Sequence, residues 1–163
     1  MRLIIMGQQA FGKACLEEVI SSGKDEVAAV YCAPDKENKP LDPIKEYALE
    51  QGLPLVQPRN FKDKEVLDEM CSFNADLCVM AYVTLFVPEA AREIPKQGSI
   101  CFHPSLLPKH RGPSSINWAI ISGSTKTGLT IFWPSDGLDE GDILLQKEVD
   151  VDKDDTLGIV YFQ

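Results

Sequence analysis

The sequence lacks the long apolar stretches that membrane proteins need. No apolar run approaches the roughly 20 residues with which a helix spans a bilayer, and the N-terminal segment MRLIIMG is too short to be a signal peptide. Apolar residues make up 44% and charged residues 25% of the 163 positions, the ordinary balance of a soluble globular domain. We therefore expect a cytoplasmic protein with no membrane partner and a core of its own.

The sequence also lacks an excess of basic residues. It has 16 Lys and Arg residues against 25 Asp and Glu residues, which gives a net charge of −9. An acidic chain does not attract the phosphate backbone of a nucleic acid over long range. Nucleic acid is therefore disfavoured as the main partner, although a local basic patch can still exist.

Metal-binding patterns are absent as well. The five cysteines include no C-x-x-C pair, and no paired ligands are spaced as a zinc site requires. We expect reduced thiols, of which Cys32, Cys78 and Cys101 lie in apolar runs and behave as small hydrophobic side chains. The acidic loop 135–142 holds three aspartates, but their spacing does not match an EF-hand. The sequence thus predicts no metal ion.

Short apolar strands alternate with amphipathic helices along the chain. Residues 2–7 form an apolar run that ends in glycine, as a buried parallel strand does. Residues 8–23 have helical spacing and a glycine at the expected C-terminal cap, and 26–32 is again a strand. This β-α-β opening implies parallel strands with a right-handed crossover. The continuing alternation predicts an open, doubly wound α/β sheet. The other expected strands are 53–57, 75–82, 99–103, 127–133 and 143–151, and the other expected helices are 43–51, 63–72, 88–94 and 113–122.

The C-terminal segment DDTLGIVYFQ starts with acidic residues and carries an apolar stripe, so it predicts a helix that begins near Asp154. The sequence stops in the second or third turn of that helix, without a cap or a polar tail. We therefore expect one domain over residues 1–163 that is cut short at its C-terminal end.

The most informative single residue is His103. It follows the apolar strand SICF and precedes Pro104, so it lies at the carboxyl end of a strand, where an open α/β sheet binds its ligands. Histidine is the side chain best suited to proton transfer near neutral pH, and the chain has only two histidines. From chemistry alone, a catalytic His103 and a structural histidine at a strand end both remain open.

Two polar loops are the other candidates. The loop SDGLDEGD, residues 135–142, follows another strand, and an aspartate from it held near His103 would make an acid–base or orienting pair. The alternative is a solvated acidic turn, and the sequence alone does not place the two together. The segment LLPKHRG is locally basic, so Lys109 or Arg111 either contacts a carboxylate or phosphate of a substrate or balances charge on a surface loop.

Together, the segments HPSLLPKHRG and DGLDEGD resemble the signature of the 10-formyltetrahydrofolate-dependent formyltransferase family. The resemblance covers essentially the whole chain, including the GQQAFG turn and the APDKENK loop. The stretches SINWAIISG and TIFWPSDGLD resemble the hydrolase domain of 10-formyltetrahydrofolate dehydrogenase more than methionyl-tRNA formyltransferase. The resemblance implies a Rossmann-like catalytic domain with an open, mostly parallel twisted sheet and helices on both faces. It also implies 10-formyltetrahydrofolate as formyl donor, and a downstream β-rich domain that this chain lacks.

The resemblance also implies residue roles. His103 would stabilise the oxyanion that forms as the formyl carbonyl is attacked, and Asp139 would orient His103 and act as base toward the attacking water or amine. The family holds the pterin ring between the loop after the fourth strand and the aspartate loop, largely through backbone groups. The corresponding positions in this sequence are Tyr82, Val83, Thr84, Phe86, Val87, Ser135, Asp136, Gly137 and Leu138.

One departure from the family pattern concerns the acceptor. The transferases carry asparagine two residues before the catalytic histidine, at the catalytic position where this sequence has Cys101. Losing such a hydrogen-bond donor in a preorganised site costs roughly 3–4 kcal/mol, and a thiol is a weak donor. The hydrolase domain also lacks that asparagine, so Cys101 favours water as acceptor. Nothing in the sequence marks Cys101 as an activated thiolate.

Several functions remain open. The leading hypothesis is formyl hydrolysis or transfer from 10-formyltetrahydrofolate, with water or a small molecule such as an amino sugar as acceptor. Initiator methionyl-tRNA is an alternative acceptor that requires the downstream domain. A non-catalytic folate-binding module is an alternative of another class. A NAD site is a further alternative, although Gly7 and Gly12 do not make a G-x-G-x-x-G motif and are explained by a tight strand-to-helix turn. The sequence does not reveal the oligomeric state.

Overall fold

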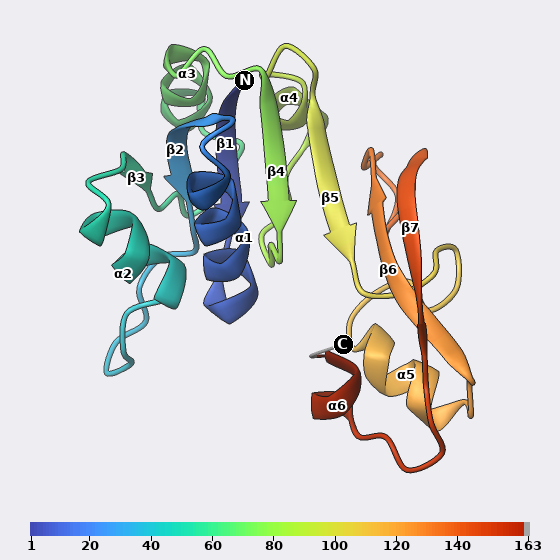
Figure 1. Ribbon diagram of the computed structural model, residues 1–163. Helices are drawn as coiled ribbons and strands as arrows, with labels where there is room; N and C mark the ends of the chain where they lie inside the picture. The colour runs from blue at the N-terminus through green and yellow to red at the C-terminus, as the bar shows by residue number, and fades with distance from the viewer. Residues whose placement is uncertain (162–163) are drawn as a thin grey trace. The chain divides into compact units, whose positions relative to one another are not determined.

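The computed structural model describes residues 1–161 and divides the chain into two compact units, residues 1–100 and a second unit from Cys101 onward (Figure 1). Residues 162 and 163, which end the expected C-terminal helix, lie outside the described residues. Hydrogen bonding between strands gives the order β3-β2-β1-β4-β5-β6-β7.

The first unit is built from alternating strands and helices, as the sequence predicts. Its strand β1 pairs in parallel with β2 and with β4, and β2 pairs in parallel with β3. The elements are β1 (Arg2–Gly7), α1 (Gln9–Ser22), β2 (Glu26–Tyr31), α2 (Pro43–Glu50), β3 (Leu55–Val56), α3 (Lys64–Ser72), β4 (Leu77–Ala81), α4 (Glu89–Arg92) and the start of β5 (Ser99–His103).

Both faces of strand β1 are buried. Leu3 and Ile5 pack in one cluster with Leu16 of α1 and with buried residues of α2. Ile4 and Met6 alternate with them, face the other side of the sheet and are buried too. Fully burying a side chain of this size stabilises the fold by about 1.5–3 kcal/mol. A sheet that is covered on both sides explains why this strand reads as a continuous apolar run.

The turn between β1 and α1 requires glycine. A Cβ atom on Gly7 would lie 2.5 Å from the Ala81 carbonyl oxygen and 3.2 Å from the Gly12 Cα atom. The two glycines therefore allow the strand end and the helix to approach each other closely, which confirms the predicted tight strand-to-helix turn.

The second unit is antiparallel. The end of β5 pairs with β6 (Lys126–Phe132), and β6 pairs with β7 (Ile143–Asp150). Helix α5 (Ser115–Ile121) follows the loop after β5, and helix α6 (Leu157–Tyr161) follows β7. The predicted α/β class with a mostly parallel sheet is confirmed, and the antiparallel β6 and β7 are its exception.

Several element boundaries differ from the predictions, and three of these differences have a local cause. Strand β3 has two residues instead of the expected 53–57, since Pro54 has no N–H to donate and takes part only through its carbonyl, which accepts from Val30. Helix α5 begins two residues later than expected, after Ser114 in the left-handed region at φ 62°. Helix α6 begins at Leu157, because the Asp155 carboxylate accepts the Asp152 N–H and forms a turn first.

Candidate active site

The imidazole of His103 is held by a backbone carbonyl. His103 is the last residue of β5 and is 7% exposed, and its Nε2 atom lies 2.9 Å from the carbonyl oxygen of His110. A carbonyl oxygen only accepts hydrogen bonds, so this contact places the hydrogen on Nε2. Nδ1 is then the ring nitrogen that can gain or lose a proton while this hydrogen bond is kept.

Asp139 faces that second nitrogen. Its Oδ2 atom lies 3.4 Å from Nδ1 of His103 and accepts the backbone N–H of Gly112 at 2.6 Å. Asp139 has a φ of 47°, a left-handed conformation that aspartate and asparagine tolerate better than most residues. The structure therefore brings together, within the second unit, the two residues that the sequence alone did not place side by side.

This arrangement is suited to holding and moving one proton. Two bare acceptor atoms, Nδ1 of a neutral imidazole and Oδ2 of a carboxylate, repel each other at this distance, whereas a proton on Nδ1 turns the repulsion into a charge-assisted attraction. Both side chains are mostly shielded, with 9% of the His103 side chain and 21% of the Asp139 side chain exposed. The pair can thus present a positive imidazolium to a developing negative charge or pass a proton between its members.

The aspartate loop, residues 135–142, is an exposed turn tied by its own backbone. The Ser135 N–H donates to the Glu140 carbonyl at 2.8 Å, and the Ser135 hydroxyl accepts the Gly137 N–H at 3.3 Å. Gly141 has no room for a Cβ atom, which would lie 1.7 Å from the Trp133 carbonyl oxygen. The predicted folate-binding residues of this loop, Ser135, Asp136, Gly137 and Leu138, are all exposed. Their contact with a folate stays a prediction.

The basic segment before α5 is joined to the aspartate loop. Arg111 Nη1 lies 2.7 Å from Glu140 Oε1, and both side chains are exposed. Arg111 therefore already has a carboxylate partner inside the protein, whereas Lys109 is exposed. The predicted contact of either residue with a substrate anion stays a prediction.

Cys101 is a half-buried thiol on β5. Its Sγ atom lies 3.6 Å from the Phe102 carbonyl oxygen, to which the thiol can donate weakly. Burial, together with the negative charge of Asp139, raises the pKa of Cys101 to about 12. Cys101 is therefore a neutral thiol at physiological pH, in agreement with the expectation that it is not an activated thiolate.

The other predicted folate-binding residues follow strand β4 in the first unit. Tyr82 has a φ of 65° and is 45% exposed, and Phe86 is 63% exposed. Thr84 donates through its hydroxyl to Gln8 Oε1 at 3.3 Å. The side chain of Val87 is buried, and its carbonyl accepts from Arg92 Nη1 at 2.8 Å. Tyr82 and Phe86 are thus the accessible aromatic rings of this loop, while Val87 anchors it.

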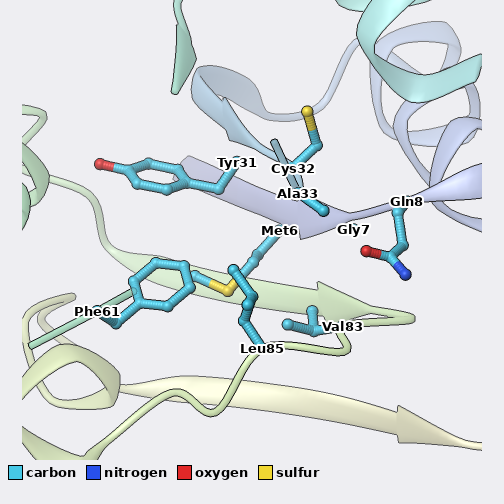
Figure 2. Close-up of a pocket in the computed structure, with 9 residues that line it drawn as sticks. All are labelled: Met6, Gly7, Gln8, Tyr31, Cys32, Ala33, Phe61, Val83 and Leu85. Atoms are coloured by element: carbon cyan, nitrogen blue, oxygen red, sulfur yellow. The ribbon is translucent and has the colours of Figure 1, made fainter. Parts of the chain in front are cut away.

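Figure 2 shows where this loop meets the end of β1. The side chains of Val83 and Leu85 line a cavity with Met6, and Tyr31 and Phe61 lie at the end away from Gln8. The cavity volume is about 10 Å³, which is at the limit for a single water molecule. It is therefore a packing feature and not a ligand pocket.

A larger groove of about 580 Å³ lies between the loop after β2 and the start of α1. It is lined by Lys36 and Lys39 but also by Asp35 and Asp42, so its charges do not select one class of ligand.

Among residues 1–161, no group of three or more His, Cys, Asp and Glu side chains is arranged to hold a metal ion. In the same range, no helix is long and apolar enough to cross a membrane.

The sequence did not identify the groups that hold the histidine and the aspartate. The His110 carbonyl and the Gly112 N–H are backbone groups, and residue types do not report where a backbone group points. The hydroxyl of Thr130 and the amide of Gln146 both contact the backbone of Leu107 in the loop after β5. The sequence did not identify these two groups either. The one available signal was that Gln146 is the single uncharged polar residue of the β7 segment ILLQKEVD.

Comparison with known proteins decides the family. The family model described as formyl transferase matches residues 1–162. The chain belongs to the formyl transferase family.

Relatives of this formyl transferase chain include two kinds of protein. The chain is 39% identical over 166 residues to cytosolic 10-formyltetrahydrofolate dehydrogenase of Xenopus tropicalis, covering 99% of this chain and 18% of that protein. It is 40% identical over 163 residues to methionyl-tRNA formyltransferase of Alkaliphilus oremlandii (strain OhILAs), covering 97% of this chain and 52% of that protein. The chain thus spans about half, or less, of the length of these curated relatives.

Solved structures confirm the fold of the formyl transferase chain. Phosphoribosylglycinamide formyltransferase from Bacillus halodurans matches with a TM-score of 0.85 at 24% identity, covering 99% of this chain and 86% of that one. A formyltetrahydrofolate deformylase from Pseudomonas syringae pv. tomato matches with a TM-score of 0.80 at 23% identity, covering 99% of this chain and 55% of that one. The α/β fold expected from the sequence is therefore confirmed, and the family model confirms the family expected from the sequence motifs.

Proposed function

We propose that this formyl transferase chain removes the formyl group from 10-formyltetrahydrofolate by means of His103 and Asp139. The observation that carries the proposal is the 3.4 Å contact between His103 Nδ1 and Asp139 Oδ2, in a site where Nε2 is already bound to a carbonyl. Family membership supplies the substrate class, because the relatives are named for formyl transfer and for 10-formyltetrahydrofolate.

With water as acceptor, the proposed reaction balances as a hydrolysis. Asp139 takes a proton from the water as its oxygen bonds to the formyl carbon, and protonated His103 stabilises the negative oxygen of the tetrahedral intermediate. The intermediate then collapses, and the bond between the formyl carbon and N10 breaks. N10 takes up the proton that Asp139 took from the water, and the products are tetrahydrofolate and formic acid, which ionises to formate.

Cys101 supports water over an amine as the acceptor. The thiol is neutral at physiological pH, since burial and the Asp139 charge raise its pKa to about 12. A neutral thiol is a weak donor, so Cys101 stabilises an oxyanion less than an asparagine at the same position. Methionyl-tRNA or an amino sugar as acceptor is the alternative, and a tRNA substrate would need protein beyond this chain.

For the folate itself, we propose contacts with residues of both predicted segments. Phe86 and Tyr82 are exposed aromatic rings beside Val83 and Thr84, and apolar contacts with a few placed polar groups are typical of small-molecule sites. In the aspartate loop, the residues from Ser135 to Leu138 are exposed, and we propose that this segment contacts the folate. We propose a cytoplasmic location for the protein.

The acceptor is tested by a product assay with the whole protein and 10-formyltetrahydrofolate. Formate is measured against formyl-methionyl-tRNA and against a formylated amino sugar, each with the acceptor supplied. The proposal predicts formate and tetrahydrofolate in equal amounts without an added amine. Folate binding that shifts the thermal midpoint, with none of the three products, would leave only a non-catalytic folate-binding module.

A further inference from the structure

The loop from Pro104 to His110 supplies the carbonyl that His103 contacts. Hydrogen bonds fix almost every backbone carbonyl of this loop. Between Pro104 and His110, every backbone carbonyl except that of Pro108 accepts a hydrogen bond within the described structure. The donors are Ser115 Oγ to Pro104 (3.0 Å), Thr130 Oγ1 to Ser105 (2.7 Å), the Lys109 N–H to Leu106 (3.0 Å), Gln146 Nε2 to Leu107 (2.9 Å), Ser105 Oγ to Lys109 (2.6 Å) and His103 Nε2 to His110 (2.9 Å).

Thr130 is the centre of this network. Its hydroxyl donates to the Ser105 carbonyl and accepts from the Leu107 N–H at 3.1 Å and from Gln146 Nε2 at 2.9 Å. A hydroxyl has one hydrogen and two lone pairs, so all its capacity is used. Thr130 is fully buried, and its position in the middle of β6 fixes the network to the sheet.

Gln146 closes the network from the neighbouring strand. It stands opposite Thr130 in the β6–β7 register, on a strand whose residues are mostly exposed, Gln146 included. Its Nε2 group donates both hydrogens, one to Leu107 and one to Thr130. A side chain that both fixes the loop carbonyl and orients the threonine hydroxyl has more than the usual role of a surface glutamine.

We propose that Gln146 is a positioning residue for His103. Through Leu107 and Thr130 it fixes the loop so that the His110 carbonyl meets Nε2 of His103, which keeps the hydrogen on Nε2 and turns Nδ1 toward Asp139. The catalytic consequence rests on the proposed function of His103, whereas the structural consequence does not.

The test replaces Gln146 without emptying the core. Gln146→Met keeps the length of the side chain and removes both donors, and Lys147→Met makes a matched change at the next position of the same exposed strand. Thr130→Ser keeps the central hydroxyl, whereas Thr130→Val removes it. For each whole protein, kcat and KM for 10-formyltetrahydrofolate are measured, and the ring nitrogen shifts of His103 are recorded by NMR with ¹⁵N-labelled histidine.

We expect Gln146→Met to lower kcat by roughly 10-fold to 100-fold with little change in KM, since a misplacement of about 1 Å can cost about 10²-fold. The His103 nitrogen shifts should move away from the Nε2–H form in Gln146→Met and Thr130→Val, and stay at parental values in Lys147→Met and Thr130→Ser. We expect Thr130→Val to destabilise the fold, because it leaves two buried backbone groups without a partner. The test with Gln146→Met is independent of that variant.

Two outcomes separate this proposal from the proposed function. Unchanged nitrogen shifts and unchanged kcat in Gln146→Met, with an active parent, would overturn the positioning role and leave the formyl chemistry standing. An inactive parent whose His103 shifts still respond to Gln146→Met, but not to Lys147→Met, would support the positioning role while the proposed function fails.

Discussion

Nδ1 of His103 lies 3.4 Å from Oδ2 of Asp139, and the same oxygen accepts the Gly112 N–H at 2.6 Å. The carboxylate is thus fixed by the backbone of the loop that also holds Nε2 of the histidine. A pair fixed from both sides needs little rearrangement when charge develops on a substrate, which is the condition under which electrostatic stabilisation is most effective.

The first prediction concerns Asp139→Asn. Asparagine tolerates the left-handed backbone at this position, and its amide oxygen can still accept the Gly112 N–H, so the fold should persist. Without a base, turnover should fall on the order of 10²-fold to 10⁴-fold. Steady-state formate release and a urea unfolding curve measure the two effects.

Asp142→Asn is the matched control for that variant. It makes the same charge change in the same loop, on an exposed residue whose backbone carbonyl accepts the Trp133 N–H. It should leave turnover near the parental value. Equal losses in both variants would mean that the charge of the loop matters and the individual carboxylate does not.

The second prediction concerns the acceptor and Cys101. Cys101→Asn introduces a neutral amide donor beside His103, where the parent has a protonated thiol. Formyl transfer to an amine acceptor should rise by at least about 10-fold, toward the 10²-fold to 10³-fold that one oxyanion donor contributes. The ratio of formylated amine to formate measures the change. If Cys101→Asn gave the same ratio as the parent and as Cys101→Ser, this position would not select the acceptor.

The third prediction concerns thiol reactivity. Burial raises the pKa of Cys101 to about 12 and that of Cys32 to about 11, whereas Cys71 is exposed. Because the thiolate is the reacting form, iodoacetamide at pH 8 should label Cys71 first and leave Cys32 and Cys101 unmodified while the protein is folded. Peptide mass spectrometry over a time course reads the order. Early labelling of Cys101 would contradict its assignment as an inert thiol.

The fold was largely predictable from the sequence, because the apolar runs of β1 and β4 and the glycine after α1 report burial and chain turns directly. The ends of short elements were not predictable from the sequence. The start of β3 depends on Pro54, and the start of α6 depends on the turn that Asp155 forms. His103 and Asp139 were reached through the resemblance of their motifs. Their distance and their backbone partners depend on the path of two loops, and no pattern of residue types encodes that path.

The fourth prediction concerns pH and Asp76. Hydrogen bonds from Lys96 and from the Arg2 backbone N–H hold the pKa of the Asp76 carboxyl below its ordinary value. A carboxyl with a lowered folded-state pKa stabilises the protein above its unfolded pKa, and this stability is lost as the pH falls through the folded pKa. Asp76→Asn should therefore have a lower thermal midpoint than the parent near neutral pH, with the difference shrinking in acid. A difference that stays constant with pH would contradict this.

The most direct test of the central claim is single-turnover conversion of 10-formyltetrahydrofolate by the whole protein and by its His103→Ala variant, with folate binding measured separately for both. We predict that the parent releases formate and tetrahydrofolate, and that the variant still binds folate but converts it at least about 10²-fold more slowly. Equal conversion by the two proteins would contradict the assignment of His103 as the catalytic group.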